Sequence, residues 1–513
     1  MTRLSKLSPA DTSSLTQVLF GQSSPTPIAE AELSKNIAWN DPSLNDSQKD
    51  AIRFALASRE VALIHGPPGT GKTHTLIELI LQLVSRGQRL LVCGPSNISV
   101  DNIVERLSSH KIPMVRLGHP ARLLPGVLNH SLDVLTRTSE AAEIVQDIRN
   151  ELDAKQASIR KTRNGRERKA IYGEMKDLRR EFREREGRVV SELLRTSKVV
   201  LSTLHGAGGH HLKDERFDTV IVDEASQALE AQCWIPALSV KGVEKLVLAG
   251  DHLQLPPTIK STNSKEKPKS AKTLEKGVKD LDLNGDGKND AKKKKTKEDH
   301  IRLETTLFDR LLSLHGPAIK RMLTTQYRMH EDIMAFPSAQ LYEGKLIAAE
   351  SVKARLLKDL EYEVQETEDT IAPLVFWDTQ GGDFPETVDD AGADGAKGKS
   401  ALLAESKINE NEASLVRLHV SRLVEAGVKE DDIAVVTPYN GQLARCKEIL
   451  GERFPGVEMG SVDGFQGREK EAVVVSLVRS NGEKEVGFLG EKRRLNGKSD
   501  HQLGLQGADG TDY

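Results

Sequence analysis

The sequence contains few of the residues that mark disulfide-rich, aromatic-lined or membrane-spanning proteins. Aromatic residues make up only 4% of the 513 residues, which argues against large aromatic cages or interface belts. The three cysteines, Cys93, Cys233 and Cys446, lie far apart and show no C-x-x-C spacing, so we expect buried, reduced thiols. The N-terminus lacks the apolar core of a signal peptide, and no apolar run reaches about 18 residues. These absences argue against a secreted or membrane protein and predict one of the cytosol, the nucleus or both.

The sequence also has little net charge, −3 at pH 7, because acidic and basic residues nearly balance. A near-neutral total does not exclude a basic groove, since the placement of charge matters more than its sum. The length suggests about two to four domains. A content of 37% hydrophobic and 29% charged residues is typical of a globular protein.

What the sequence does contain is an alternation of short apolar runs and amphipathic segments. Residues 44–58 predict a helix capped by Asn45 or Asp46, because apolar residues recur there at helical spacing. Strands and helices then alternate at 61–66, 73–87, 89–96 and 99–109. Further strands are expected at 198–206, 217–226 and 245–251. This order predicts an α/β fold, with a parallel sheet that carries helices on both faces.

A second α/β unit begins near Leu323. Its strands are expected at 373–379, 433–439 and 472–480, and its helices at 409–427 and 440–450. The chain therefore divides into a lead-in segment, a first domain, a second domain and a disordered tail, at 1–40, 41–320, 321–496 and 497–513.

Three segments interrupt the α/β pattern. Residues 131–196 are highly charged with sparse apolar positions, which predicts an inserted arm of two antiparallel helices hinged near Asn164 and Gly165. For this arm, a solvated hairpin and a surface that touches a ligand strand through its arginines are both open. The Lys-rich segment 260–300 and the run 389–400 are predicted to be disordered or loop-like.

The Lys-rich segment contains half of a calcium-loop pattern. Residues 282–287 match its first positions, but the twelfth position, which requires a bidentate Glu, is Lys293. We therefore do not expect calcium binding. The lysines at 292–295 are expected to be a solvated charge run rather than a nuclear import signal or a phosphate contact.

The stretch GPPGTGKT matches the phosphate-binding loop G-x-x-x-x-G-K-[ST] in full, and it follows a predicted strand and opens a predicted helix. Its glycines let backbone N–H groups close around phosphate oxygens, and the helix N-terminus adds positive potential. Lys72 would reach the β- and γ-phosphates, and Thr73 would hold Mg²⁺. The sequence therefore predicts ATP and Mg²⁺ as cofactors. The predicted nucleotide-binding residues of the loop are Gly66, Pro67, Pro68, Gly69, Thr70, Gly71, Lys72 and Thr73.

Two adjacent carboxylates end the buried apolar strand in VIVDEAS. Such a pair is unfavourable at this position unless a cation or a mechanism uses it. We expect Asp223 to coordinate Mg²⁺ and Glu224 to polarise the attacking water, with a helix-capping acid pair as the alternative. In LAGDHLQLPP a strand again ends in polar groups, and Gln254 is expected to sense the γ-phosphate or to place the water.

These motifs, with TTQYRMHEDI, VVTPYNGQ and GSVDGFQGREKE, occur in the order found in superfamily 1 helicases. Over residues 18–496 the sequence resembles the branch that contains the nonsense-mediated-decay helicase and the immunoglobulin mu-binding helicase with its fungal counterpart. The resemblance implies two RecA-like P-loop NTPase domains with parallel sheets. It also implies that Gln48 reads adenine, that Tyr327 stacks on the base and that Glu469 contacts the ribose. Arg328 would reach the γ-phosphate as an arginine finger, with a structural ion pair as the alternative.

The resemblance also implies contacts to the backbone of single-stranded DNA or RNA. Small hydroxyl and amide groups suit phosphate and sugar contacts without sequence reading, whereas loop capping is the alternative for each residue. Movement from 5′ to 3′ is implied in the same way. The choice between DNA and RNA stays open, as do replication or ribosome-associated complexes as partners. The implied residues are Pro95, Ser96, Asn97, Ser202, Thr203, Thr437, Pro438 and Tyr439.

Compared with this family, the sequence is expected to be short at both ends. The N-terminus leaves no room for the family's β-barrel domain. In the family, the RRLN found here at 493–496 is followed by a segment V-A-L-T-R-A-[RK] that supplies a second arginine, whereas here Gly497 opens a polar tail. We expect ATP binding to survive and hydrolysis to be slow, because a lost charge-stabilising arginine can raise the barrier by several kcal/mol.

The sequence thus predicts an ATP-dependent helicase or translocase that hydrolyses ATP. An ATP-binding nucleic-acid clamp with impaired hydrolysis is the alternative. A small-molecule kinase is disfavoured, because it would leave the second α/β unit without a role.

Overall fold

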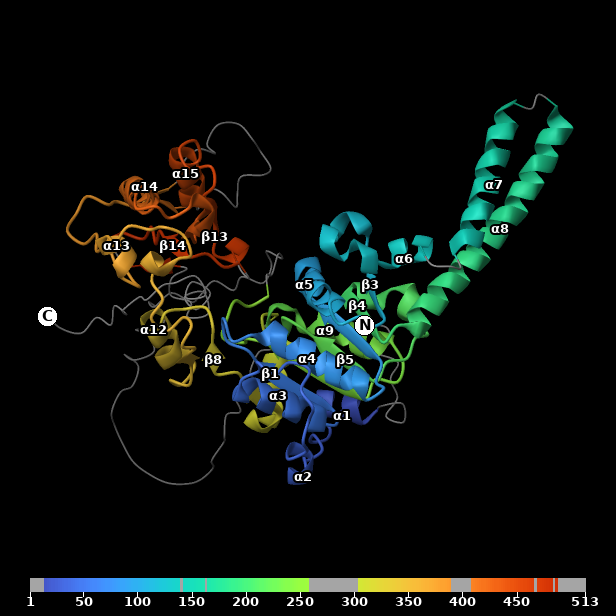
Figure 1. Cartoon of the computed structure of the whole chain (residues 1–513), viewed down its shortest axis with the longest axis horizontal. Coiled ribbons are helices and arrows are strands. Elements are labelled where there is room, and N and C mark those ends of the chain that lie inside the picture. Colours follow the sequence, from blue (N-terminus) through green and yellow to red (C-terminus); the bar gives the residue numbers. More distant parts are fainter. Residues whose placement is uncertain are drawn as a thin grey trace, which may run out of the picture.

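The computed structural model describes residues 13–138, 142–161, 164–257, 303–388, 407–465, 468–482 and 485–487. These residues form two α/β units, and a helical arm projects from the first (Figure 1). The predictions for the Lys-rich segment, its calcium-loop match, the run 389–400 and the tail lie outside the described residues. In the part of the chain that the structure describes, no helix combines the length and the apolar composition that a membrane crossing requires.

The first unit is built on a parallel sheet whose strands, among the described residues, have the order β3-β4-β2-β5-β6-β1-β7. Most of these strands are buried on both faces, so they appear in the sequence as continuous apolar runs. β3 and β7 were not predicted, because short strands that contain Arg116, Lys320 and Arg321 form no such run. The bounds are β1 Val61–His65, β2 Leu90–Gly94, β3 Met114–Leu117, β4 Val199–Thr203, β5 Thr219–Val222, β6 Lys245–Gly250 and β7 Lys320–Met322.

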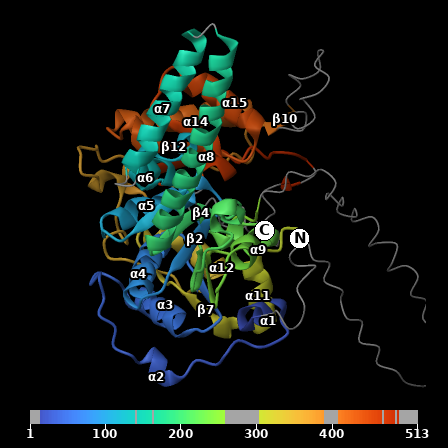
Figure 2. The ribbon, with the colours of Figure 1, turned by 90° about the vertical axis from the view of Figure 1, so that its right-hand side faces the viewer.

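Helices cover both faces of this sheet (Figure 2). Ile64 contributes to the core under α3, α4 and α5, whereas its neighbour Leu63 contributes to the core under α9 and α11. This division follows from the alternation of side chains along a strand. Cys93 and Cys233 are buried thiols, as is Cys446 in the second unit, which confirms the prediction for them. The helix bounds are α3 Asp46–Ala57, α4 Lys72–Ser85, α5 Asn97–Ser108, α9 Glu230–Ser239 and α11 Leu307–His315.

From residue 13, where the described part of the chain begins, the lead-in segment is part of the first unit rather than separate from it. Helix α1 (Ser14–Phe20) buries Leu19 in the same core as α9 and α11, and the short α2 (Glu30–Leu33) follows. The Glu60 carboxylate, on the loop before β1, accepts hydrogen bonds from the Ser14 hydroxyl (2.9 Å) and the Thr26 amide (3.0 Å). The predicted boundary near residue 41 is therefore corrected, because this segment contributes apolar side chains to the core.

The inserted arm consists of α6 (Leu132–Thr138), α7 (Ala142–Lys161) and α8 (Gly165–Thr196). As predicted, its two long helices pack against each other and turn back near Gly165 (Figure 1). Lys155 of α7 forms an ion pair with Glu174 of α8 (2.5 Å). Most of the arm side chains whose burial the structure describes are exposed, which accounts for the charged composition of the arm.

The second unit has a smaller parallel sheet, with the order β13-β12-β14 among the described residues. The helices α14 and α15 were predicted with nearly their observed bounds and pack on this sheet. The elements are β8 Thr325–Gln326, α12 Glu331–Leu341, β9 Ile347–Ala348, α13 Glu368–Ile371, β10 Thr387–Val388, β11 Lys407–Ile408, α14 Glu410–Glu425, β12 Ile433–Thr437, α15 Asn440–Leu450, β13 Glu458–Ser461 and β14 Ala472–Val475.

The strand expected at 373–379 is not formed. Among the described residues β14 pairs only with β12, and a cavity of about 290 Å³ lies between β14 and residues 373–379. The cavity separates this apolar run from the open edge of β14, so the run forms no ladder of hydrogen bonds there, and the Phe376 side chain stays 64% exposed. The prediction was wrong because an apolar run becomes a strand only where its backbone pairs with a neighbouring strand.

Candidate nucleotide site and nucleic-acid interface

The phosphate loop connects the end of β1 to the start of α4, as predicted. Gly69 (φ +68°) and Gly71 (φ +74°) adopt left-handed backbone conformations that glycine tolerates best. A Cβ at Gly69 would lie 2.7 Å from the Arg328 Cβ, and a Cβ at Gly71 would lie 2.6 Å from the Gln48 Nε2. Both glycines are therefore required by backbone geometry and by the close approach of these side chains.

Gln48 packs against the phosphate loop. It accepts from the Asn45 amide (3.1 Å) in a capping box at the start of α3, which confirms Asn45 as the cap. Its Nε2 donates to the Thr70 carbonyl (3.1 Å), and the side chain is buried. Adenine reading by Gln48 stays a prediction, and its observed contacts support the shape of the loop.

Lys72 meets the two predicted carboxylates at the carboxyl ends of β1 and β5. Its ammonium contacts the Glu224 carboxylate and lies 3.7 Å from Asp223 Oδ1. Burial lowers the pKa of Lys72, but Glu224 and Asp223 outweigh burial and raise it above its usual value. Burial raises the pKa of the Asp223 carboxyl to about 6, although Lys72 opposes this shift. A further cation beside Asp223 would therefore be favourable.

The carboxylates fit the cofactor that the sequence predicts. Thr73 lies in the first turn of α4 beside Lys72, and hydroxyl and carboxylate oxygens are the ligands that Mg²⁺ prefers. Glu224 has a left-handed backbone (φ +52°), uncommon for a residue with a side chain, and its other oxygen accepts from Gln227 Nε2 (2.7 Å). Strain of this kind concentrates at functional sites.

Asp251, which follows β6, joins three parts of the chain. Its carboxylate interacts with His65 Nε2 of β1 (2.8 Å) and accepts from the Tyr342 hydroxyl (2.6 Å), just after α12. It also accepts from Gln254 Nε2 (2.9 Å) and the Leu253 amide (3.0 Å), so it fixes the predicted water-placing residue. The sequence analysis did not single out Asp251, His65 or Tyr342. Of the three, only Asp251 had a signal in the sequence, namely its position at the end of a strand.

Tyr327 and Arg328 lie against the phosphate loop. The Tyr327 amide donates to the Gly69 carbonyl (2.8 Å), its hydroxyl accepts from Asn45 Nδ2 (2.9 Å), and its side chain is 43% exposed. The Arg328 guanidinium binds the Glu469 carboxylate, with Nε 3.0 Å from Oε1. Arg328 and Glu469, both predicted to contact the nucleotide, therefore form an ion pair with each other in this structure. This is the alternative that the sequence left open for Arg328.

The predicted nucleic-acid residues of the first unit gather at one sheet edge. β2 and β4 are neighbours, with Gly94 opposite Thr203, so the segments 95–97 and 202–203 emerge side by side. Ser96 caps α5 by accepting from the Ser99 amide (3.1 Å), as the loop-capping alternative proposed. Ser202 is buried, whereas Pro95, Ser96, Asn97 and Thr203 keep exposed surface.

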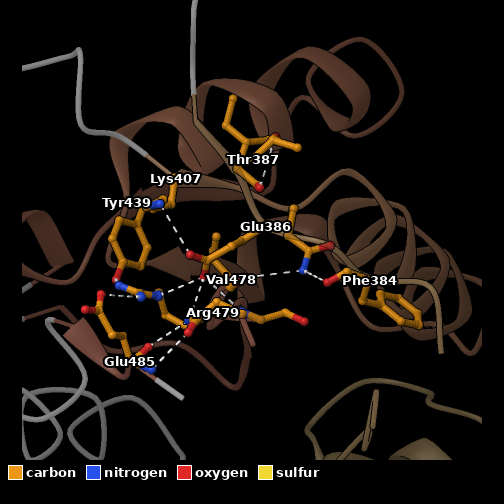
Figure 3. A network of polar contacts seen from close by, with 12 residues as sticks. Phe384, Glu386, Thr387, Lys407, Tyr439, Val478, Arg479 and Glu485 are labelled. Carbon is orange, nitrogen blue, oxygen red and sulfur yellow. Dashed lines mark hydrogen bonds and ion pairs between the residues drawn. The ribbon is translucent and has the colours of Figure 1, made fainter. Parts of the chain in front are cut away.

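In the second unit, the predicted residues follow β12. Thr437 and Tyr439 are buried, and only Pro438 keeps part of its surface. The Tyr439 ring is therefore not presented to a nucleotide. Its hydroxyl instead accepts from Arg479 Nη1 (3.5 Å), in a polar network that Figure 3 shows. Through this contact, Tyr439 helps to hold the Arg479 side chain in place.

Comparison with known proteins shows to which family this architecture belongs. Two models, each described as an AAA domain, match residues 43–262 and 303–498. Over 94% of its length, the chain is 48% identical to the DNA polymerase alpha-associated DNA helicase A of Schizosaccharomyces pombe. The chain belongs to the superfamily 1 helicases. It is also 43% identical, over 96% of its length, to the DNA-binding protein SMUBP-2 of Rattus norvegicus.

This superfamily 1 chain is shorter than those relatives. It spans 66% of the fission yeast protein and 45% of the rat protein. Over 89% of its length it is also 34% identical to the regulator of nonsense transcripts 1 homolog of Neurospora crassa, of which it spans 36%. The resemblance to this helicase branch and the α/β fold with two domains are thereby confirmed.

One buried ion pair lies beside the predicted nucleic-acid residues of the first unit and was missed in the sequence. Arg116 of β3 is fully buried, and its Nε donates to Asp101 of α5 (2.7 Å). Its Nη2 donates to Asn97 Oδ1 (3.0 Å), so a buried charge fixes the start of α5. An arginine inside a short strand gives no sequence signal for this role.

Proposed function

We propose that this chain is the motor of an ATP-dependent helicase or translocase that hydrolyses ATP on single-stranded DNA or RNA. One observation carries the proposal: Lys72, Asp223 and Glu224 converge at the carboxyl ends of two parallel strands, and Arg328 lies against the phosphate loop. Phosphoryl transfer to water uses this set of charges. Movement from 5′ to 3′ is proposed from the family resemblance.

In the proposed reaction, Lys72 leaves Glu224 and pairs with the β- and γ-phosphates of ATP. Glu224 then orients the attacking water and accepts its proton, while Asp251 holds Gln254 in place beside the reacting phosphate. Arg328 exchanges Glu469 for the γ-phosphate, where its charge stabilises the transition state. Mg²⁺, held by Thr73 and Asp223, would neutralise phosphate charge.

The nucleic-acid track is proposed to follow the carboxyl edges of both sheets. The exposed parts of Pro95, Ser96, Asn97, Thr203 and Pro438 lie at these edges, and ligands of open α/β sheets bind there. Backbone contacts of this kind serve DNA and RNA alike. We propose the nucleus, the cytosol or both as compartments, and replication or ribosome-associated complexes as partners.

The test is the steady-state ATPase rate with and without a single-stranded oligonucleotide. Wild-type chain should be stimulated by the oligonucleotide, and Lys72→Ala should abolish the turnover. Lys176→Ala, on the exposed face of the arm, serves as the control and should leave the rate unchanged. ATP binding without turnover in the presence of the oligonucleotide would refute the motor and favour the clamp.

A further inference from the structure

The carboxylate of Glu386, just before β10, sits among positive and N–H groups (Figure 3). Arg479 Nε lies 2.9 Å from one of its oxygens, and Lys407 Nζ lies 3.3 Å from the other. The Ser480 amide (3.0 Å) and Asn481 Nδ2 (3.3 Å) donate to it as well. Burial would raise the pKa of Glu386, but the hydrogen bonds from Ser480, Asn481 and Lys407 and the positive charge of Arg479 together lower it below its usual value. The carboxylate therefore occupies an anion site, formed by two cationic side chains and two N–H donors.

This anion site lies at the same edge as the predicted track of the second unit. β12 and β14 are parallel neighbours, with Val436 opposite Val475, so the segments that follow them emerge together. Arg479 follows β14, and Tyr439 follows β12 and accepts from Arg479 Nη1 (3.5 Å). The carboxyl edge of a parallel sheet is where ligands of such folds bind.

The backbone before Arg479 is held in an unfavourable conformation. Val478 has φ +73°, which is a genuine outlier for a β-branched residue. Glu412 of α14 holds this turn by accepting from the Leu477 amide (2.6 Å) and the Val478 amide (2.8 Å). Asn409 Nδ2 donates to the Val478 carbonyl (3.3 Å). Surroundings that impose such strain are found where a side chain must be aimed, and the side chain aimed here is Arg479.

We propose that Arg479, Lys407 and the Ser480 amide form a subsite for one backbone phosphate of the nucleic acid, and that Glu386 occupies this subsite as an internal competitor. The inference rests on the proposed function, since it assigns a contact on the same track. A phosphodiester presents two oxygens and one negative charge, as a carboxylate does, so the same donors suit both. The strand must displace Glu386 to bind there, and this lowers the affinity of the resting chain.

The experiment measures binding of fluorescent single-stranded dT and rU oligonucleotides by anisotropy across a salt series. Glu386→Gln keeps a polar side chain of the same size but removes the competing charge. It should tighten binding about fivefold or more, which is the usual range of coupling between two sites. Adding Arg479→Ala to Glu386→Gln should remove this gain and reduce the slope of log affinity against log salt by about 0.7, the value for one single-strand phosphate.

A matched control is Glu230→Gln, which removes the charge from another partly buried ion pair, with Arg310 Nε at 2.8 Å, in the first unit. Its oligonucleotide affinity should equal that of the wild type. Lys407→Ala, which leaves Glu386 intact, should weaken binding, and thermal melting of each variant checks that it folds. If folded Glu386→Gln bound the oligonucleotide no more tightly than the wild type, the inference would be overturned. The proposed function would still stand if the oligonucleotide stimulated the ATPase of the wild type. Absence of oligonucleotide binding in every folded variant would overturn both.

Discussion

Replacement of Tyr342 by phenylalanine tests the contact that ties α12 to the strand ends of the first unit. The Tyr342 hydroxyl, itself buried, donates to the buried Asp251 carboxylate at 2.6 Å. A hydrogen bond to a charged group contributes about 1.5 to 3 kcal/mol to stability. For a unit of roughly 150 to 250 residues, such a loss lowers Tm by about 3 to 12 °C.

The assay is thermal melting at neutral pH, with Tyr172→Phe as the matched control. Tyr172 is 54% exposed on the arm helix α8, so its hydroxyl should contribute little and the control should melt like the wild type. Because Tyr342→Phe keeps the ring, a loss of stability reports the hydroxyl and not the packing. Equal Tm values for the two variants would refute the role assigned to this bond.

The pH dependence of this contact has a definite sign. Burial would raise the pKa of Asp251, but His65, the Tyr342 hydroxyl and the Leu253 amide together lower it below its usual value. A carboxyl whose pKa is lower in the folded state stabilises the fold above its unfolded pKa of about 3.9, and this contribution is lost as pH falls through the folded value. The Tyr342→Phe deficit should therefore be complete at pH 7 and shrink in strong acid.

Three further substitutions test other parts of the structure. Glu224→Gln should keep ATP binding, measured with a fluorescent analogue, but lower the turnover about 10²- to 10⁴-fold, since it removes the base; unchanged turnover would contradict that role. Leu19→Ala should destabilise the first unit by about 2 to 5 kcal/mol in urea unfolding, because α1 belongs to its core, and a neutral result would show that the lead-in is dispensable. Arg116→Gln should leave Asp101 buried without its partner, lower stability by about 3 to 5 kcal/mol and weaken oligonucleotide binding; unchanged affinity in a folded variant would separate Arg116 from the track.

The sequence alone determined the parts of this protein that depend on local pattern. The phosphate loop and the carboxylate pair were found because each requires particular residues at fixed spacing beside an apolar run. The helices at 440–450 and 46–57 follow from periodicity and, for the second, from the Asn45 cap. Family membership followed from the order of the motifs, which a linear sequence preserves.

Tertiary structure decided whatever depends on a partner distant in the chain. The run 373–379 is as apolar as a strand, yet in the structure a cavity separates it from the open edge of β14. Tyr439 was expected at the track, but burial turns it into a support for Arg479. Asp251 gathers His65 and Tyr342 from positions 186 and 91 residues away in the sequence. Spacing along the chain carries no information about such contacts, because they form only when the sheet and helices bring distant polar groups into the same water-excluded space.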